Sequence, residues 1–128
     1  KKDKFFFKRL IIFIHIAFFS AKYLFSKNIV KFNSLINKEI NQTLPEYFSA
    51  SALIRYCLFF FKITNMKSCF MRSLVIREIL GRCGITSKIE IGISKSSGSF
   101  ESHCWVKYEN YYTERADIRR KFKILESN

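Results

Sequence analysis

The first half of the chain places apolar residues at helical spacing. Residues 10–21 are almost wholly apolar. Because apolar side chains occur all round this segment, we expect a helix that is buried or lies at an interface. Residues 28–42 carry their apolar side chains on one helical face and predict an amphipathic helix. That face consists of Ile29, Phe32, Ile36 and Ile40.

Pro45 separates this segment from a third predicted helix. Proline lacks a backbone N–H and ends the helical pattern there. Ser49 or Ser51 can then cap the helix that follows. The apolar positions of this helix are Leu53, Ile54, Cys57, Leu58 and Phe61.

A fourth helix is expected to begin at Cys69, with the Ser68 hydroxyl as its N-terminal cap. Gly84 can end this helix in the left-handed conformation, with Ile85 folded back against it. Polar residues such as Glu78 fall largely outside the buried stripe. That stripe consists of Leu74, Val75, Ile79, Leu80 and Cys83.

Strand-like alternation follows the fourth helix. Residues 89–94 alternate between isoleucine and polar or small residues, which indicates a strand. Residues 95–99 are polar and predict a loop, and residues 100–108 predict a second strand. Residues 109–110 can form a tight turn that leads into a third strand over residues 111–115. A helix followed by an antiparallel meander places the chain in the α+β class.

The tight turn sets the register of the last two predicted strands. If residues 109–110 are its two loop residues, Tyr108 faces Tyr111. The same count makes His103 face Ala116. A change of one residue in the turn would move every side chain to the other face of the sheet.

This register puts His103 and Glu114 on one face of the sheet, because alternate residues of a strand share a face. Glu114 lies diagonal to His103, within reach of a long carboxylate side chain. Cys104 points to the opposite face, toward the helices, and Asp117 also belongs to that face. The other members of the His103 face are Trp105, Lys107 and Tyr112.

Length and charge limit the classes of function. The 128 residues are expected to form a single domain, with residues 1–66 as a helical N-terminal portion and residues 67–128 as a catalytic core. A net charge of +13 favours acidic partners, which include nucleic acid, anionic membrane surfaces and acidic peptides. The basic residues are scattered and follow no RNA-binding or zinc-finger pattern, so no nucleic-acid partner is expected.

The four cysteines occur without a CxxC pair. Zinc sites usually place two ligands close together, so we expect no metal site and no cofactor. A disulfide framework is not indicated either, because nothing in the sequence points to an oxidising compartment. Cys57, Cys83 and Cys104 are interpreted as small buried apolar residues.

The N-terminus has a basic segment, residues 1–9, ahead of its apolar helix, as a signal peptide does. The uncharged run is too short to span a bilayer, contains His15 and precedes no convincing cleavage site. We therefore expect a cytoplasmic protein. Secretion and contact of this helix with a membrane surface stay open as alternatives.

Cys69, His103 and Glu114 suggest a thiol-nucleophile site. The positive end of a helix dipole and free backbone N–H groups favour a thiolate at Cys69, and such donors can also hold a developing oxyanion. His103 can act as the general base. Glu114, with Asp117 as the runner-up, can orient the imidazole. Arg72 either stabilises the thiolate or covers the helix surface.

These residues lie in motifs that resemble the lasso-peptide leader peptidases, small bacterial enzymes with a transglutaminase-like cysteine-protease core. The motifs are CFMRSL from Cys69, Gly84-Ile85, IEIG from Ile89 and HCWV from His103, and the resemblance covers residues 67–122. It implies a papain/transglutaminase-like fold, with Cys69 as nucleophile, His103 as general base and Glu114 at the position of the acid.

The resemblance also implies the substrate and partners. Such enzymes remove the leader from a ribosomally made precursor peptide with the help of a separate leader-recognition protein, before a lasso cyclase closes the ring. The chain departs from the family at several positions. The usual acid is Asp, the turn is often one residue longer, Lys107 replaces a common Glu, and Cys104 replaces the usual Ala after the histidine. Asp117 therefore stays open as the acid.

Two alternative functions use the same fold. A noncatalytic scaffold would only bind the peptide. An acyl transferase would use the same three residues with an amine in place of water.

Overall fold

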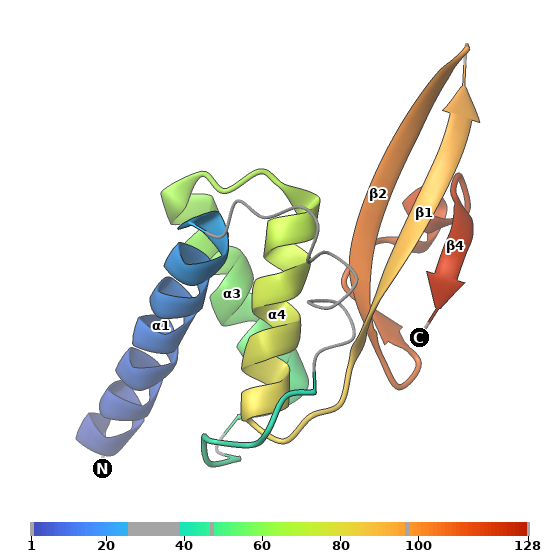
Figure 1. The fold of residues 1–128 in the computed structure, drawn as a ribbon. Helices are drawn as coiled ribbons and strands as arrows, with labels where there is room; N and C mark the ends of the chain where they lie inside the picture. The colour runs from blue at the N-terminus through green and yellow to red at the C-terminus, as the bar shows by residue number, and fades with distance from the viewer. Residues whose placement is uncertain (1, 26–38, 47, 97, 128) are drawn as a thin grey trace.

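Helix α4 (Cys69–Arg82) lies between two other helices and an antiparallel sheet (Figure 1). The computed structural model describes residues 2–25, 39–46, 48–96 and 98–127. The mixture of helices and an antiparallel sheet confirms the α+β class. The remaining elements are α1 (Lys2–Phe25), α3 (Ala50–Thr64), β1 (Lys88–Ser96), β2 (Ser99–Tyr108), β3 (Tyr111–Tyr112), α5 (Ala116–Arg119) and β4 (Lys123–Ser127).

The N-terminal helix α1 is longer than the predicted residues 10–21. One face of α1 is buried against the other helices, with Ile12, Ile16 and Phe19 in the core, whereas the apolar side chains on its other face are exposed. No helix among the described residues has both the length and the apolarity needed to cross a membrane.

The second predicted helix, residues 28–42, falls mostly outside the described residues. Its last part, residues 39–42, is described and is not helical. The helix predicted after Pro45 is confirmed as α3. Ser49 is its cap, because the Ser49 hydroxyl accepts a hydrogen bond from the backbone N–H of Ala52 at 3.3 Å.

The bounds of α4 follow the predicted capping residues. The Ser68 hydroxyl accepts a hydrogen bond from the N–H of Met71 at 3.3 Å, so the helix begins at Cys69 as expected. At the other end, Gly84 has a φ of +86°, and the N–H of Ile85 returns to the carbonyl of Leu80 at 2.8 Å. This is the predicted left-handed termination.

The expectation that Glu78 lies outside the buried surface of α4 is wrong. Glu78 is completely buried, because α1 packs against the side of α4 that carries this residue. The hydroxyl of Tyr23 in α1 donates a hydrogen bond to Glu78 Oε1 at 3.1 Å. Arg82 Nε lies 3.7 Å from the other carboxylate oxygen. Helix α4 is therefore buried on nearly all sides.

The sheet has the strand order β3-β2-β1-β4. Strands β1 and β2 pair from Lys88↔Lys107 to Ser96↔Ser99, so most of the predicted polar loop at residues 95–99 is strand. Strand β4 was not predicted. It pairs antiparallel with the free edge of β1, which turns the predicted meander of three strands into a sheet of four.

The predicted register of β2 and β3 is confirmed at Tyr108↔Tyr111. Glu109 takes a φ of +52° in the turn, as a two-residue hairpin loop requires. The predicted pairing of His103 with Ala116 is wrong. Strand β3 ends at Tyr112, and Ala116 begins the short helix α5.

We expect Tyr23→Phe to lower the free energy of unfolding by about 1–3 kcal/mol, because the buried Glu78 carboxylate loses a hydrogen-bond donor. Urea denaturation measures this change. Tyr111→Phe is the matched control, since it removes a hydroxyl from an exposed tyrosine and should change stability by less than about 0.5 kcal/mol. Equal stabilities of the two variants would contradict the role of Tyr23.

Candidate active site

Cys69 faces the inner side of the sheet from the first turn of α4. Its side chain is half-buried, and its Sγ lies 3.4 Å from the Sγ of Cys104 in β2. Cys104 is buried on the side of β2 that packs against α4, as the strand alternation predicts. The Ser73 hydroxyl, one turn along α4, lies 3.8 Å from the Cys104 sulfur. The two sulfur atoms are thus in contact where the start of α4 meets β2.

His103 and Glu114 are in direct contact. His103 Nε2 lies 2.8 Å from Glu114 Oε2, and both side chains are about three-quarters buried. Glu114 lies beyond the last residue of β3, yet its backbone is still held against the sheet. The N–H of Thr113 donates to the carbonyl of Val106 at 3.0 Å, and Arg119 Nε donates to the carbonyl of Glu114 at 3.0 Å.

Asp117 lies elsewhere. Its carboxylate is exposed and accepts two hydrogen bonds from Arg115, from Nε at 3.1 Å and from Nη2 at 2.7 Å. The structure therefore brings Glu114, and not Asp117, to His103.

The candidate residues line one small cavity of about 60 Å³. Arg72 also reaches this cavity, while its guanidinium lies 5.5 Å from the centre of the Phe61 ring. The cavity is lined by Leu58, Cys69, Arg72, Ser73, Ile76, His103, Cys104, Thr113 and Glu114. The three residues that the sequence singles out for chemistry therefore share one space.

The family model of the Transglutaminase-like superfamily matches residues 32–127. The chain belongs to this superfamily. Its members are commonly cysteine peptidases or acyltransferases. The match includes α3 as well as α4 and the sheet, so the transglutaminase-like region extends into the helical N-terminal portion. No curated protein and no solved structure matches the chain.

In this transglutaminase-like protein, hydrogen bonds lower the pKa of the Cys69 thiol from its ordinary 9.0 to about 5. The largest cause is a hydrogen bond from the Cys104 thiol to the Cys69 sulfur. The backbone N–H of Cys104 and the side chain of His103 act in the same direction, and burial opposes them. The same contact with Cys69, together with burial, raises the pKa of Cys104. Cys104 is therefore the donor of the pair and Cys69 the thiolate.

The rings of Trp105 and Phe122 form an aromatic shelf beside His103. The ring centre of Trp105 is 6.0 Å from that of His103, and the ring centre of Phe122 is 5.7 Å from it. Trp105 is itself fixed, because its buried indole N–H donates to Glu90 Oε1 at 2.9 Å. A Cβ on Gly92, the residue opposite His103, would lie 2.5 Å from the Cβ of Phe122. Gly92 is therefore needed for Phe122 to reach the imidazole.

Sequence patterns do not reveal this shelf. Phe122 comes from the segment just before β4, and the pairing of β4 with β1 was not predicted. The isolated Gly92 within a strand of isoleucines is the one available signal, since such glycines often mark a close approach of another segment.

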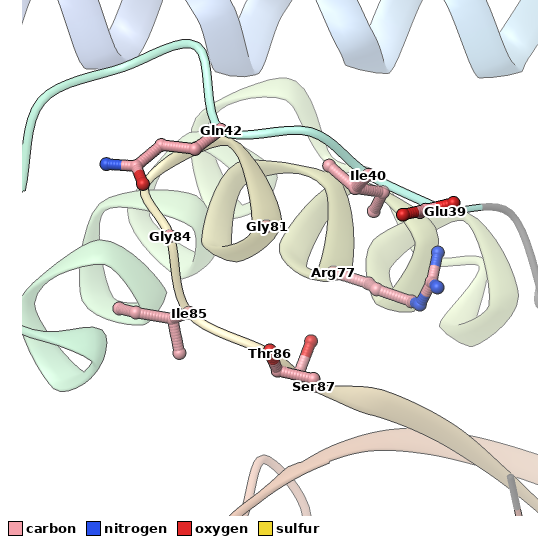
Figure 2. Close-up of a pocket in the computed structure, with 9 residues that line it drawn as sticks. All are labelled: Glu39, Ile40, Gln42, Arg77, Gly81, Gly84, Ile85, Thr86 and Ser87. Atoms are coloured by element: carbon pink, nitrogen blue, oxygen red, sulfur yellow. The ribbon is translucent and has the colours of Figure 1, made fainter.

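A larger cavity of about 340 Å³ lies at the opposite end of α4 (Figure 2). Its walls come from residues 39–42, the last turns of α4 and the connection to β1, and Arg77 and Glu39 point toward one another there. It contains none of the predicted site residues. Among the described residues there is also no group of three or more metal-ligating side chains.

We expect the alkylation of Cys69 by iodoacetamide to rise with pH through about 5 and to level off by about pH 7, because the thiolate is the reactive form. In Cys104→Ala the main thiolate-stabilising donor is lost, so the pKa should rise toward 9.0. At pH 6 the reaction should then slow by about tenfold once the pKa of Cys69 reaches about 7, and by more if it rises further toward 9.0. Mass spectrometry of the Cys69 peptide follows the reaction.

Cys83→Ala is the control for this titration. It removes another buried cysteine from the far end of α4 and should leave the profile unchanged. Identical profiles for the wild type and Cys104→Ala would show that Cys104 is not the donor.

Proposed function

We propose that this protein is a cysteine peptidase that removes the leader from a ribosomally made lasso-peptide precursor. Cys69 is the nucleophile, His103 the general base and Glu114 the acid that orients the imidazole. The observation that carries this proposal is the 2.8 Å contact between His103 and Glu114 beside a half-buried cysteine at a helix N-terminus. A histidine that only supports the fold would not require a neighbouring cysteine with a lowered pKa.

His103 is oriented for the first step. Its Nε2 is held by Glu114, which leaves Nδ1 to interact with Cys69. In this step His103 takes the proton of the Cys69 thiol, and the pKa of Cys69, lowered to about 5, favours the thiolate that results. The thiolate attacks the carbonyl carbon of the peptide bond that joins leader and core. The backbone N–H of Cys69 has no acceptor within the helix and can donate to the oxyanion that forms.

The second step releases the two products. The tetrahedral intermediate collapses as the C–N bond breaks, and the imidazolium gives its proton to the amine of the core peptide. The leader is then held on Cys69 as a thioester. His103 takes a proton from water, which attacks the thioester, and the Cys69 thiolate leaves as the leader carboxylate forms.

The choice of substrate rests on the motifs around Cys69 and His103 that resemble the leader peptidases. The cavity of about 60 Å³ at Cys69 lies where the scissile bond would have to sit. Recognition of the leader is then the task of a separate protein, and the lasso cyclase receives the released core. The chemistry needs no cofactor.

We expect Cys69→Ala to reduce cleavage of the cognate precursor by about 10³-fold or more, because the covalent pathway is lost. The assay combines the protein, its leader-recognition partner and the precursor peptide, and fragment masses report the products. Cys83→Ala is the matched control and should retain activity. Cleavage that survives Cys69→Ala would rule out the proposed nucleophile.

The same assay separates the alternatives. A product that carries an added amine in place of the new carboxylate would indicate an acyl transferase. A noncatalytic scaffold would yield no fragments and no adduct between Cys69 and an electrophilic peptide.

We expect Glu114→Gln to lower kcat/KM by about 10- to 100-fold, which corresponds to one hydrogen bond to a charged group of roughly 1.5–3 kcal/mol. Asp117→Asn is the matched control. It removes an exposed carboxylate that is bound to Arg115 and should change kcat/KM less than about twofold. The reverse pattern would identify Asp117 as the acid.

A further inference from the structure

The contact between Cys69 and Cys104 brings together two thiols that differ in solvent exposure. Cys69 is half-buried and opens into the small cavity, whereas Cys104 is only 7% exposed. The two sulfur atoms are 3.4 Å apart, and a disulfide requires about 2.05 Å. The two sulfur atoms must therefore approach by roughly 1.35 Å for the bond to form.

Oxidation of the Cys69 thiolate has two outcomes. A thiolate that solvent can reach is converted by hydroperoxides to a sulfenic acid. A sulfenic acid without a neighbouring thiol is oxidised further to a sulfinic acid, which is irreversible for most proteins. If a thiol lies in contact with the sulfenic acid, the two groups condense to a disulfide, which other thiols can reduce again.

We infer that Cys104 is the resolving cysteine of Cys69, and that hydroperoxides convert the pair to a Cys69–Cys104 disulfide that reversibly inactivates the peptidase. The inactivation rests on the proposed function. The disulfide itself does not, because it depends only on the two sulfur atoms.

The reaction balances in two steps. The Cys69 sulfur attacks one oxygen of the hydroperoxide, an S–O bond forms as the O–O bond breaks, and the second oxygen leaves as hydroxide or alkoxide and takes up a proton. This oxidises Cys69 by two electrons and reduces the peroxide. The Cys104 sulfur then attacks the Cys69 sulfur, the S–O bond breaks, and water leaves with the Cys104 proton.

The surroundings of the pair favour this reaction over others. The Ser73 hydroxyl, 3.8 Å from the Cys104 sulfur, donates a hydrogen bond that favours the Cys104 thiolate. Cys57 and Cys83 are almost completely buried, and burial raises the pKa of both thiols, to about 11 for Cys83. They do not compete as thiolates near neutral pH. A disulfide would also occupy the Cys69 sulfur, which could then neither exchange a proton with His103 nor attack a substrate.

The test treats the full chain with hydrogen peroxide, blocks the remaining thiols at low pH and digests it with trypsin. Cleavage after Lys67, Arg72, Lys95 and Lys107 releases Cys69 in residues 68–72 and Cys104 in residues 96–107. The wild type should lose two hydrogens in mass and yield these two peptides joined by a disulfide. Dithiothreitol should separate them.

Cys104→Ala should yield no linked peptide. Treated near pH 9.0, where Cys69 ionises without this donor, it should gain two oxygens on Cys69, which dithiothreitol does not remove. Cys83→Ala is the matched control and should yield the linked peptide in the same amount as the wild type. Irreversible oxidation of Cys69 at the same rate in the wild type and Cys104→Ala, or a disulfide to Cys57 or Cys83, would overturn the inference.

Cleavage of the precursor gives a second measurement. Peroxide should reduce wild-type cleavage at least tenfold, and dithiothreitol should restore it. For Cys104→Ala, dithiothreitol should restore none of the cleavage that peroxide removes. A wild type that forms the disulfide but never cleaves the precursor would reject the proposed function alone. A wild type that cleaves the precursor but forms no disulfide would reject the resolving role alone.

Discussion

The geometry of the candidate site depends on the burial of α4 between α1, α3 and the sheet. The nucleophile is the first residue of this helix, and a frayed helix end would not hold a sulfur atom against one position of a strand. Packing on several sides prevents such movement, because tightly packed interiors leave few alternative arrangements. The buried Glu78 adds to this constraint. Its carboxylate accepts the Tyr23 hydroxyl from α1, so a shift of α1 along α4 would leave a buried charge without that donor.

The features that the sequence predicted correctly obey local rules. Ser68 and Ser49 begin their helices because a hydroxyl oxygen satisfies an amide of the first turn, and Gly84 ends α4 because it tolerates a positive φ. The turn at residues 109–110 defines the facing pair Tyr108 and Tyr111, and strand alternation carries that register back along β2. The contact of His103 with Glu114 could therefore be predicted from the sequence, although it joins residues eleven positions apart.

The features that the sequence did not predict depend on contacts between distant segments. The sequence near Glu78 gives no sign that α1 will cover this residue, so its carboxylate was assigned to the polar side of α4. Strand β4 pairs with β1 across an intervening hairpin and a short helix, and only that pairing brings Phe122 over Gly92 and beside the imidazole. The polar residues 95–99 also suggested a loop. Their pairing into a long hairpin is set by the register of the whole of β1 and β2 rather than by their own composition.

Glu114 and Cys104 act on the site through their side chains in two separate ways. Strand β3 ends at Tyr112, so Glu114 lies beyond the regular pairing with β2, and its side chain still reaches Nε2 of His103. Cys104 follows His103 directly and must point to the opposite side of the strand, which is the side that faces Cys69. A small apolar residue at this position would offer only its backbone N–H to the nucleophile. Cys104 adds a second donor, so the side chain that stabilises the thiolate is also in place to act as the partner for its oxidation.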